Sequence, residues 1–376
     1  MMRTLIIFIL TGISWSISAQ DAFFSQYYLA PIQFNPALAG TANGCDRISL
    51  MYKSQWTRLY QNYQYAFASY EKLKDGIHGA YGISLNRNEE GNGVLTRTFF
   101  TGTYAYHMLL SKNSRLYVGF QASIFNRTID FSKLIYRDQL DPRFGVTKPS
   151  AALPIVNSRF APDFSTGIAY RNNFNKTQGM LIGLAVKHLT SPDESLLGFD
   201  QVNLNTTWTL HGSFSHTFQT NNEYRRLIQA VSPQFILQKQ GGFEMGQIGI
   251  MAKSDYFTVS AFYRWNSYLM NLNYPDAVVM AVRIQNFKAK ELKQVKNPFE
   301  AGFAYDLTAN AIGFNGLGPS YEIGFATMPH GVTCDGPGEM YKNRIRLPIV
   351  GKNRKLRTNG KNVPFQDKKT KCEDFL

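Results

Sequence analysis

The segment DRISLMYKSQW, from Asp46 to Trp56, alternates between apolar and polar side chains. Its apolar members are Ile48, Leu50, Tyr52 and Trp56, and its polar members include Arg47, Ser49, Lys53 and Gln55. Successive side chains of a β-strand point to opposite faces, so this pattern predicts a strand with one apolar face and one polar face. The pattern recurs along most of the chain, which favours an all-β fold.

About fourteen such segments are expected as strands. They lie near residues 46–56, 63–72, 77–87, 94–109, 114–128, 163–173, 178–190, 206–219, 226–238, 242–253, 256–265, 277–287, 299–309 and 320–328. One face of each is apolar, and the other carries small or polar residues that are unsuited to a water-soluble core. Ile168 and Tyr170, for example, alternate with Gly167, Ala169 and Arg171. We therefore expect the apolar faces to point outward into lipid.

A closed sheet removes both exposed edges and pairs every backbone group that faces lipid. An even number of strands is typical of bacterial single-chain barrels. We predict that residues 46–329 form a transmembrane antiparallel up-and-down β-barrel of about fourteen strands in an outer membrane.

The first 19 residues have the features of a secretory signal peptide. A single charge at Arg3 precedes an apolar run from Leu5 to Leu10, and small residues end at Ala19. Cleavage there would leave Gln20 at the mature N-terminus. No later stretch has the roughly eighteen uninterrupted apolar residues that a membrane helix needs.

Residues 20–45 form an aromatic segment in which Pro31 and Pro36 interrupt any helix or strand. We expect this segment to be ordered and packed at or inside the periplasmic mouth of the barrel. Short polar connections such as 74–76 would face the periplasm, and long ones such as 137–162 would form outer loops. An even strand number then places both termini in the periplasm.

The whole chain carries a formal net charge of +14. Two of its basic stretches would also lie on the periplasmic side. One is the connection 287–298, and the other is a C-terminal tail at residues 330–376. Their docking candidates are Lys288, Lys290, Lys293, Lys296, Arg344, Arg346, Lys352, Arg354, Lys355 and Arg357. Nucleic acid is absent from that compartment, so anionic headgroups, peptidoglycan carboxylates or an acidic protein are the expected partners. The alternative is that the connection 287–298 is a solvated turn and that residues 330–376 are a solvated tail without a specific partner.

Cys45 stands just before the first expected strand, and Cys334 follows the last one. If those two strands pair to close the barrel, both cysteines reach the same rim in an oxidising compartment. We therefore predict a disulfide between Cys45 and Cys334. The sequence leaves a bond between Cys334 and Cys372 open as an alternative.

Catalytic motifs are missing from the sequence: it has no HExxH, CxxC, G-x-S-x-G or P-loop pattern. His211 and His216 would face opposite sides of a strand, which argues against shared metal ligation. We expect no catalytic residue, metal ion or cofactor. Inward-facing charges would instead pair across a narrow lumen. The candidates are Arg97, Arg127, Arg171, Lys187, Arg264, Glu244, Glu300 and Asp306.

Several segments, in their order and spacing, resemble the PorP/SprF family of Bacteroidetes outer-membrane proteins. They are QDAFFSQYYLAPIQFNPALAG (20–40) with QW at 55–56, PDFSTGIAYR (162–171), GLAVKHLTSPDESL (183–196), SPQFILQKQGG (232–242), FEAGFAYDLTAN (299–310) and PSYEIGFA (319–326). The resemblance implies a non-enzymatic barrel of the type IX secretion and gliding machinery. Its partners would be a periplasmic secretion ring, a peptidoglycan-binding protein or a secreted adhesin. The tail beyond Pro348 and the Cys45 and Cys334 pair do not belong to the resemblance.

Two other functions stay open at this point. A diffusion channel or substrate-specific channel would need an open lumen. A hydrolase on the barrel wall would need an active site, and the sequence nominates no residue for one.

Overall fold

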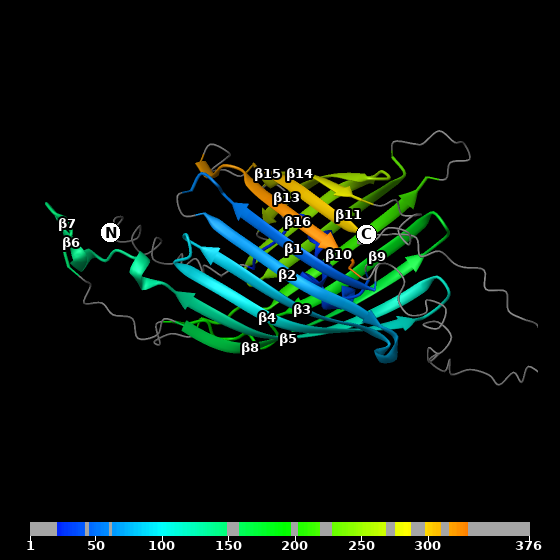
Figure 1. The fold of residues 1–376 in the computed structure, drawn as a ribbon, viewed down its shortest axis with the longest axis horizontal. Coiled ribbons are helices and arrows are strands. Elements are labelled where there is room, and N and C mark those ends of the chain that lie inside the picture. Colours follow the sequence, from blue (N-terminus) through cyan, green and yellow to red (C-terminus); the bar gives the residue numbers. More distant parts are fainter. Residues whose placement is uncertain are drawn as a thin grey trace, which may run out of the picture.

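The computed structural model describes residues 21–41, 45–59, 62–148, 158–196, 202–218, 228–267, 275–286, 298–309 and 316–329. Fourteen long strands form a closed antiparallel barrel (Figure 1). They are β1 (Asp46–Gln55), β2 (Tyr63–Lys74), β3 (Gly79–Glu90), β4 (Leu95–Leu109), β5 (Ser114–Ile129), β8 (Ser158–Asn173), β9 (Gln178–Lys187), β10 (Thr207–Thr217), β11 (Ala230–Gln240), β12 (Phe243–Lys253), β13 (Phe257–Ser267), β14 (Pro275–Gln285), β15 (Phe299–Thr308) and β16 (Ser320–Thr327). The expected barrel is confirmed, and each expected strand overlaps an observed one.

The remaining elements are short. The 3₁₀ helices are η1 (Tyr27–Leu29), η2 (Pro31–Gln33), η3 (Pro36–Leu38), η4 (Asp75–Ile77), η5 (Phe131–Lys133) and η6 (Arg137–Gln139). Strands β6 (Leu140–Asp141) and β7 (Gly145–Val146) form a separate hairpin, which is set away from the barrel in Figure 1. Within the described part of the chain, no helix has the length and apolar character needed to span a bilayer.

Strand β1 closes the barrel by pairing with both β2 and β16. The β1–β16 register runs from Ile48 opposite Thr327 to Ser54 opposite Tyr321. No edge of the sheet is left unpaired by this arrangement, which is the condition for a sheet to lie in lipid.

The apolar side chains point away from the barrel axis, as expected. Leu50, Ile83, Phe100, Ile124 and Ile323 are each about half exposed. Their strand neighbours on the other face are buried polar, charged or small residues. Examples are Ser49, Lys53, Ser84, Thr101, Ser123 and Glu322. The lumen is therefore the polar side of the sheet, and the lipid-facing surface is the apolar side.

One face assignment differs from the sequence pattern. Glu244 was expected to face inward, but it lies on the face of the exposed Ile248 and binds the exposed Lys239. Glu244 is the second residue of β12 at the loop end, so its outward charge lies near the rim of the barrel and not in the middle of the lipid-facing surface. Trp265 is buried because its ring lies over Gly246 of β12, but it still shares the outward face of Tyr263, on which it stacks.

The barrel has two distinct ends. We call the end with the connections 75–78, 110–113, 174–177 and 254–256 the turn end, and the end with 130–157 and 188–206 the loop end. The alternation of lengths is not strict, because Gly241 and Gly242 alone join β11 to β12 at the loop end. Gly241 adopts a φ of +56°, which this tight hairpin requires.

Candidate functional site

The N-terminal segment, residues 21–41, lies inside the barrel lumen. Phe24, Leu29, Ile32 and Leu38 are completely or almost completely buried there, although none of them belongs to the sheet. Pro31 and Pro36 begin η2 and η3, where proline is favoured because its missing N–H needs no partner. The chain therefore crosses the lumen as a series of tight turns.

The segment runs from the loop end to the turn end. At its start, the Asp21 N–H donates to Gln240 Oε1 at 2.8 Å, and Gln240 is the last residue of β11. At its finish, the Gly40 N–H donates to Glu71 Oε2 at 2.8 Å, near the turn-end terminus of β2. Asn35 caps the N-terminus of η3, where its Oδ1 accepts a hydrogen bond from the Ala37 N–H at 2.9 Å.

This path changes one expectation about the barrel. The segment was expected at or inside one mouth, but it occupies the lumen from one end to the other. Asp21, the first described residue, lies at the loop end. Thr327 ends β16 at the turn end. The expectation that both termini lie in the periplasm stays a prediction, because both termini lie outside the described residues.

A buried charge network around Ser25 links the N-terminal segment to the wall near the loop end of the barrel. Lys53 Nζ lies 3.2 Å from Asp306 Oδ2, and Arg264 Nη1 lies 2.9 Å from the same oxygen. Arg264 also donates from Nε to Asp276 Oδ2 at 2.6 Å. The Ser25 hydroxyl donates to Asp306 at 2.9 Å. Every charge in this network has an opposite charge as a neighbour, which burial requires.

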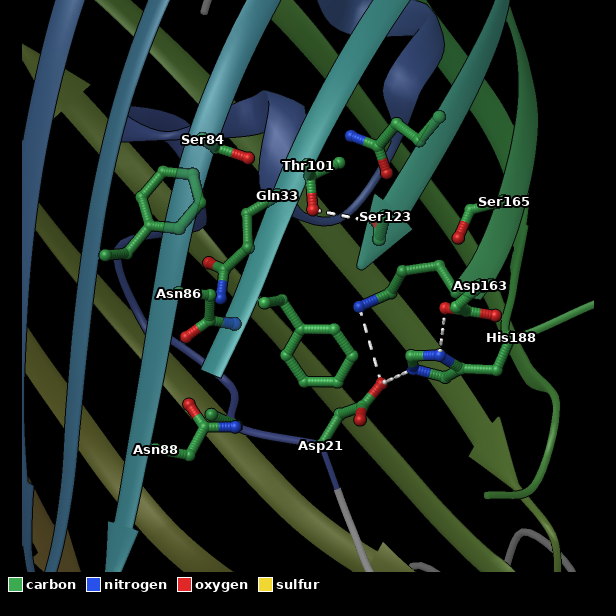
Figure 2. A pocket seen from close by; sticks show the side chains of 15 residues that line it. Asp21, Gln33, Ser84, Asn86, Asn88, Thr101, Ser123, Asp163, Ser165 and His188 are labelled. Carbon is green, nitrogen blue, oxygen red and sulfur yellow. Dashed lines mark hydrogen bonds and ion pairs between the residues drawn. The ribbon is translucent and has the colours of Figure 1, made fainter. Parts of the chain in front are cut away.

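A second cluster fixes the start of the segment (Figure 2). His188 Nε2 lies 2.8 Å from Asp21 Oδ2, and His188 Nδ1 lies 2.6 Å from Asp163 Oδ2. Lys187 Nζ approaches Asp21 Oδ2 at 3.4 Å. His188 itself adopts a φ of +58°, which is uncommon for a residue other than glycine. The neighbouring cavity of about 50 Å³ is lined mainly by polar side chains, including Asn88.

The charges of this cluster set the protonation of its members. Burial alone would lower the pKa of His188, but the Asp21 charge and hydrogen bonds with Asp163 and Asp21 raise that pKa to about 9. Burial would raise the pKa of Asp21, but the charges of His188 and Lys187 hold it well below its usual value. The Asp21–His188 contact is therefore an ion pair at neutral pH.

The loop after β9 folds back over the lumen at the loop end. Glu194 Oε2 accepts from both Arg97 Nη2 and Arg127 Nη1 at 2.8 Å. Leu204, later in the same loop, is buried against Phe99 and Phe125. The loop thus packs onto the inner wall. Glu194 was not among the residues expected from the sequence to form ion pairs in the lumen.

The structure brings most of the expected inward charges into ion pairs. Arg97 and Arg127 share Glu194, Arg264 pairs with Asp306, and Arg283 pairs with Glu300 at 3.0 Å. Lys187 pairs with Asp21. Three histidines touch the N-terminal segment, a role that their scattered positions in sequence did not suggest. They are His188 at Asp21, His211 at Asn35 and His107 at Ala39.

The other expected site residues fall largely outside the described ranges. Cys45 is disulfide-bonded, but Cys334 and Cys372 lie outside the described residues, so the choice of partner stays a prediction. All ten docking candidates also lie outside them: Lys288, Lys290, Lys293, Lys296, Arg344, Arg346, Lys352, Arg354, Lys355 and Arg357. Among the described residues, no group of three or more His, Cys, Asp or Glu side chains is placed to hold a metal ion.

Solved structures with a similar overall arrangement are bacterial membrane barrels of very different sequence. The toluene transporter TbuX of Ralstonia pickettii is 10% identical, with a TM-score of 0.42 over 80% of this chain and 92% of that one. The toluene transporter TodX of Pseudomonas putida is 7% identical, with a TM-score of 0.42 over 83% and 95%. A FadL homologue of Pseudomonas aeruginosa is 11% identical, with a TM-score of 0.39 over 79% and 93%.

No curated protein sequence matches the chain. The sequence profile of one family, described as type IX secretion system membrane protein PorP/SprF, matches residues 16–326. That range spans most of the chain, and includes the whole N-terminal segment and nearly all of the barrel. The chain therefore belongs to the PorP/SprF family of type IX secretion system membrane proteins.

Proposed function

We propose that this protein is a non-enzymatic outer-membrane component of the type IX secretion and gliding machinery. In this role it supports secretion or surface anchoring of cargo by docking periplasmic ring components, a peptidoglycan-binding protein or a secreted adhesin. Membership of the family is one support for this proposal.

The observation that carries the proposal is the filled lumen. Residues 21–41 occupy the barrel from end to end, and buried ion pairs and hydrogen bonds hold Asp21 and Ser25. A barrel filled in this way offers its two rims and its connecting loops to other molecules. A partner-binding role therefore suits the protein better than a pore.

The basic stretches are the proposed periplasmic contact surface. Deleting residues 351–376 together with 288–296 should weaken co-purification with periplasmic or secreted partners from detergent-solubilised membranes. Substituting the exposed Lys112 and Lys176 at the turn end gives a matched control for loss of positive charge elsewhere. Normal secretion, normal surface display and unchanged co-purification in the deletion variant would together refute the docking role.

Conductance distinguishes this proposal from a channel. The purified protein should be electrically silent in a planar bilayer, because the N-terminal segment blocks the lumen. A steady open-pore current from the intact protein would instead favour a diffusion channel or substrate-specific channel. Turnover of lipid by the pure protein would point to a hydrolase.

A further inference from the structure

The lumen wall binds the main chain of the N-terminal segment along its whole length, in addition to its side chains. Four of the segment's N–H groups donate to wall side chains at 2.7 to 2.8 Å: Asp21 to Gln240, Ser25 and Gln26 to Glu322, and Gly40 to Glu71. Wall side chains reach five of its carbonyl oxygens at 2.9 to 3.2 Å: Lys53 at Phe23, Gln247 at Ser25, Ser49 at Leu29, Gln121 at Ile32 and His107 at Ala39. These contacts satisfy backbone groups that a strand would pair within a sheet.

Glycines of the wall make room for the segment. A Cβ at Gly119 would lie 2.2 Å from the backbone N of Ala37, and one at Gly167 would lie 2.2 Å from Asn35 Oδ1. A Cβ at Gly302 would lie 2.2 Å from Gln26 Oε1. These strand positions face the lumen, so it is the segment rather than the sheet that excludes a side chain there. The wall is therefore shaped to the segment.

The wall charges around Ser25 pair with one another without help from the segment, whereas Lys187 has Asp21 as its counter-charge. Asp21 is the single charged residue between positions 21 and 41. Lys53 and Arg264 already have Asp306 as a shared counter-charge, and Arg264 has Asp276 as well. Water could therefore replace the segment around Ser25 without leaving Lys53 or Arg264 unpaired, and His188 would keep Asp163 as its counter-charge.

The barrel closes without any strand from the segment. Its fourteen strands form a complete ring from β1 to β16. The segment joins that ring covalently only through residues 42–44, which lead from Thr41 to Cys45.

From these four features we infer that the lumen is a peptide-binding site whose resident ligand is residues 21–41, and that binding does not require the covalent link to the barrel. Its ligand class is a nearly uncharged polypeptide held in an irregular, turn-rich conformation. The inference stands independently of the docking role proposed above.

The test uses the full chain with a protease recognition sequence inserted between Thr41 and Cys45. After cleavage in detergent, the segment should co-elute with the folded barrel and separate from it only under denaturing conditions. After the segment is washed out in urea and the urea is removed, a labelled synthetic peptide of residues 20–41 should bind the barrel. A scrambled peptide of the same composition should not bind.

Two glycine variants test whether the fit to the wall decides retention. Gly119→Ala should shorten the retention of the cleaved segment by about tenfold or more, because backbone atoms of Ala37 cannot yield to the new methyl group. Gly102→Ala is the matched control, since the nearest atom to its added Cβ is 4.0 Å away on the wall itself. Loss of the segment on cleavage while the barrel stays folded would overturn the inference. Equal retention in the two variants would overturn it as well.

Discussion

His188 bridges Asp21 and Asp163, with its two ring nitrogens 2.8 Å and 2.6 Å from their carboxylate oxygens. One carboxylate belongs to the N-terminal segment and the other to β8, so the imidazole links the segment to the barrel wall. Both ring nitrogens must carry protons to donate to two carboxylates. The link therefore depends on pH.

This link should be strongest at mildly acidic pH. The pKa of His188 rises to about 9 in the folded protein, so its contribution to stability is complete below its unfolded pKa of about 6.5 and is lost as pH rises to about 9. Folding lowers the pKa of Asp21, so its contribution to stability has the opposite pH dependence. That contribution disappears as pH falls below about 4. Between pH 6.5 and 9 the link should lose about 2 to 3 kcal/mol.

Urea unfolding in detergent at several pH values measures this change. The difference in unfolding free energy between the wild type and His188→Gln should shrink as pH rises from 6.5 to 9. Taking the difference removes titrations that the two proteins share. A difference that stays constant across this range would show that His188 carries no charge in the folded protein.

Asp306 holds two buried cations, and its loss should be costly. Asp306→Ala leaves Lys53 and Arg264 short of a counter-charge inside the lumen. Removing one partner of a buried ion pair typically costs about 3 to 5 kcal/mol. The free energy of unfolding in detergent should fall by that amount.

The exposed pair of Arg87 and Glu89 provides the control for this experiment. Glu89→Ala should change the unfolding free energy by less than about 1 kcal/mol, because water screens exposed pairs. Similar losses in the two variants would mean that the Asp306 network adds nothing beyond a surface contact.

The path of residues 21–41 predicts that the two ends of the mature chain are accessible from opposite sides of the membrane, and not from the periplasm alone as the sequence predicts. Asp21 lies at the loop end of the barrel, and Thr327 ends the last strand at the turn end. With the loop end facing outward, an epitope placed directly after Gln20 should bind antibody on intact cells. An epitope at the C-terminus should bind only after the outer membrane is opened. Equal behaviour of both epitopes would contradict this topology.

The disulfide of Cys45 should involve Cys334. Cys45 stands at the turn end, where its carbonyl oxygen accepts from the Leu73 N–H at 2.7 Å, and β16 ends on the same rim. Mass spectrometry of a non-reduced digest should recover the peptides containing Cys45 and Cys334 as one linked species. Cys372→Ser should leave that species intact, whereas recovery of Cys45 linked to Cys372 from the unaltered protein would refute the predicted pairing.

Local alternation was enough to predict the barrel. The period of two in segments such as Asp46–Gln55 and Gln178–Lys187 predicted their positions and the side of the sheet that meets lipid. The physical reason is that side-chain direction in a strand depends only on the parity of the residue. The prediction failed at Glu244, which was expected to face the lumen but lies on the outward face of β12 near the rim.

The sequence by itself thus determined the sheet, its closure and its lipid-facing surface, because neighbouring residues carry all of that information. Only the tertiary structure decided what fills the lumen. Contacts such as Ser25 with Asp306 and Asp21 with His188 join residues far apart in the chain, and no local period encodes them. Only the closed ring of strands brings the charged wall residues around the N-terminal segment, so its path across the lumen could not be derived from spacing alone.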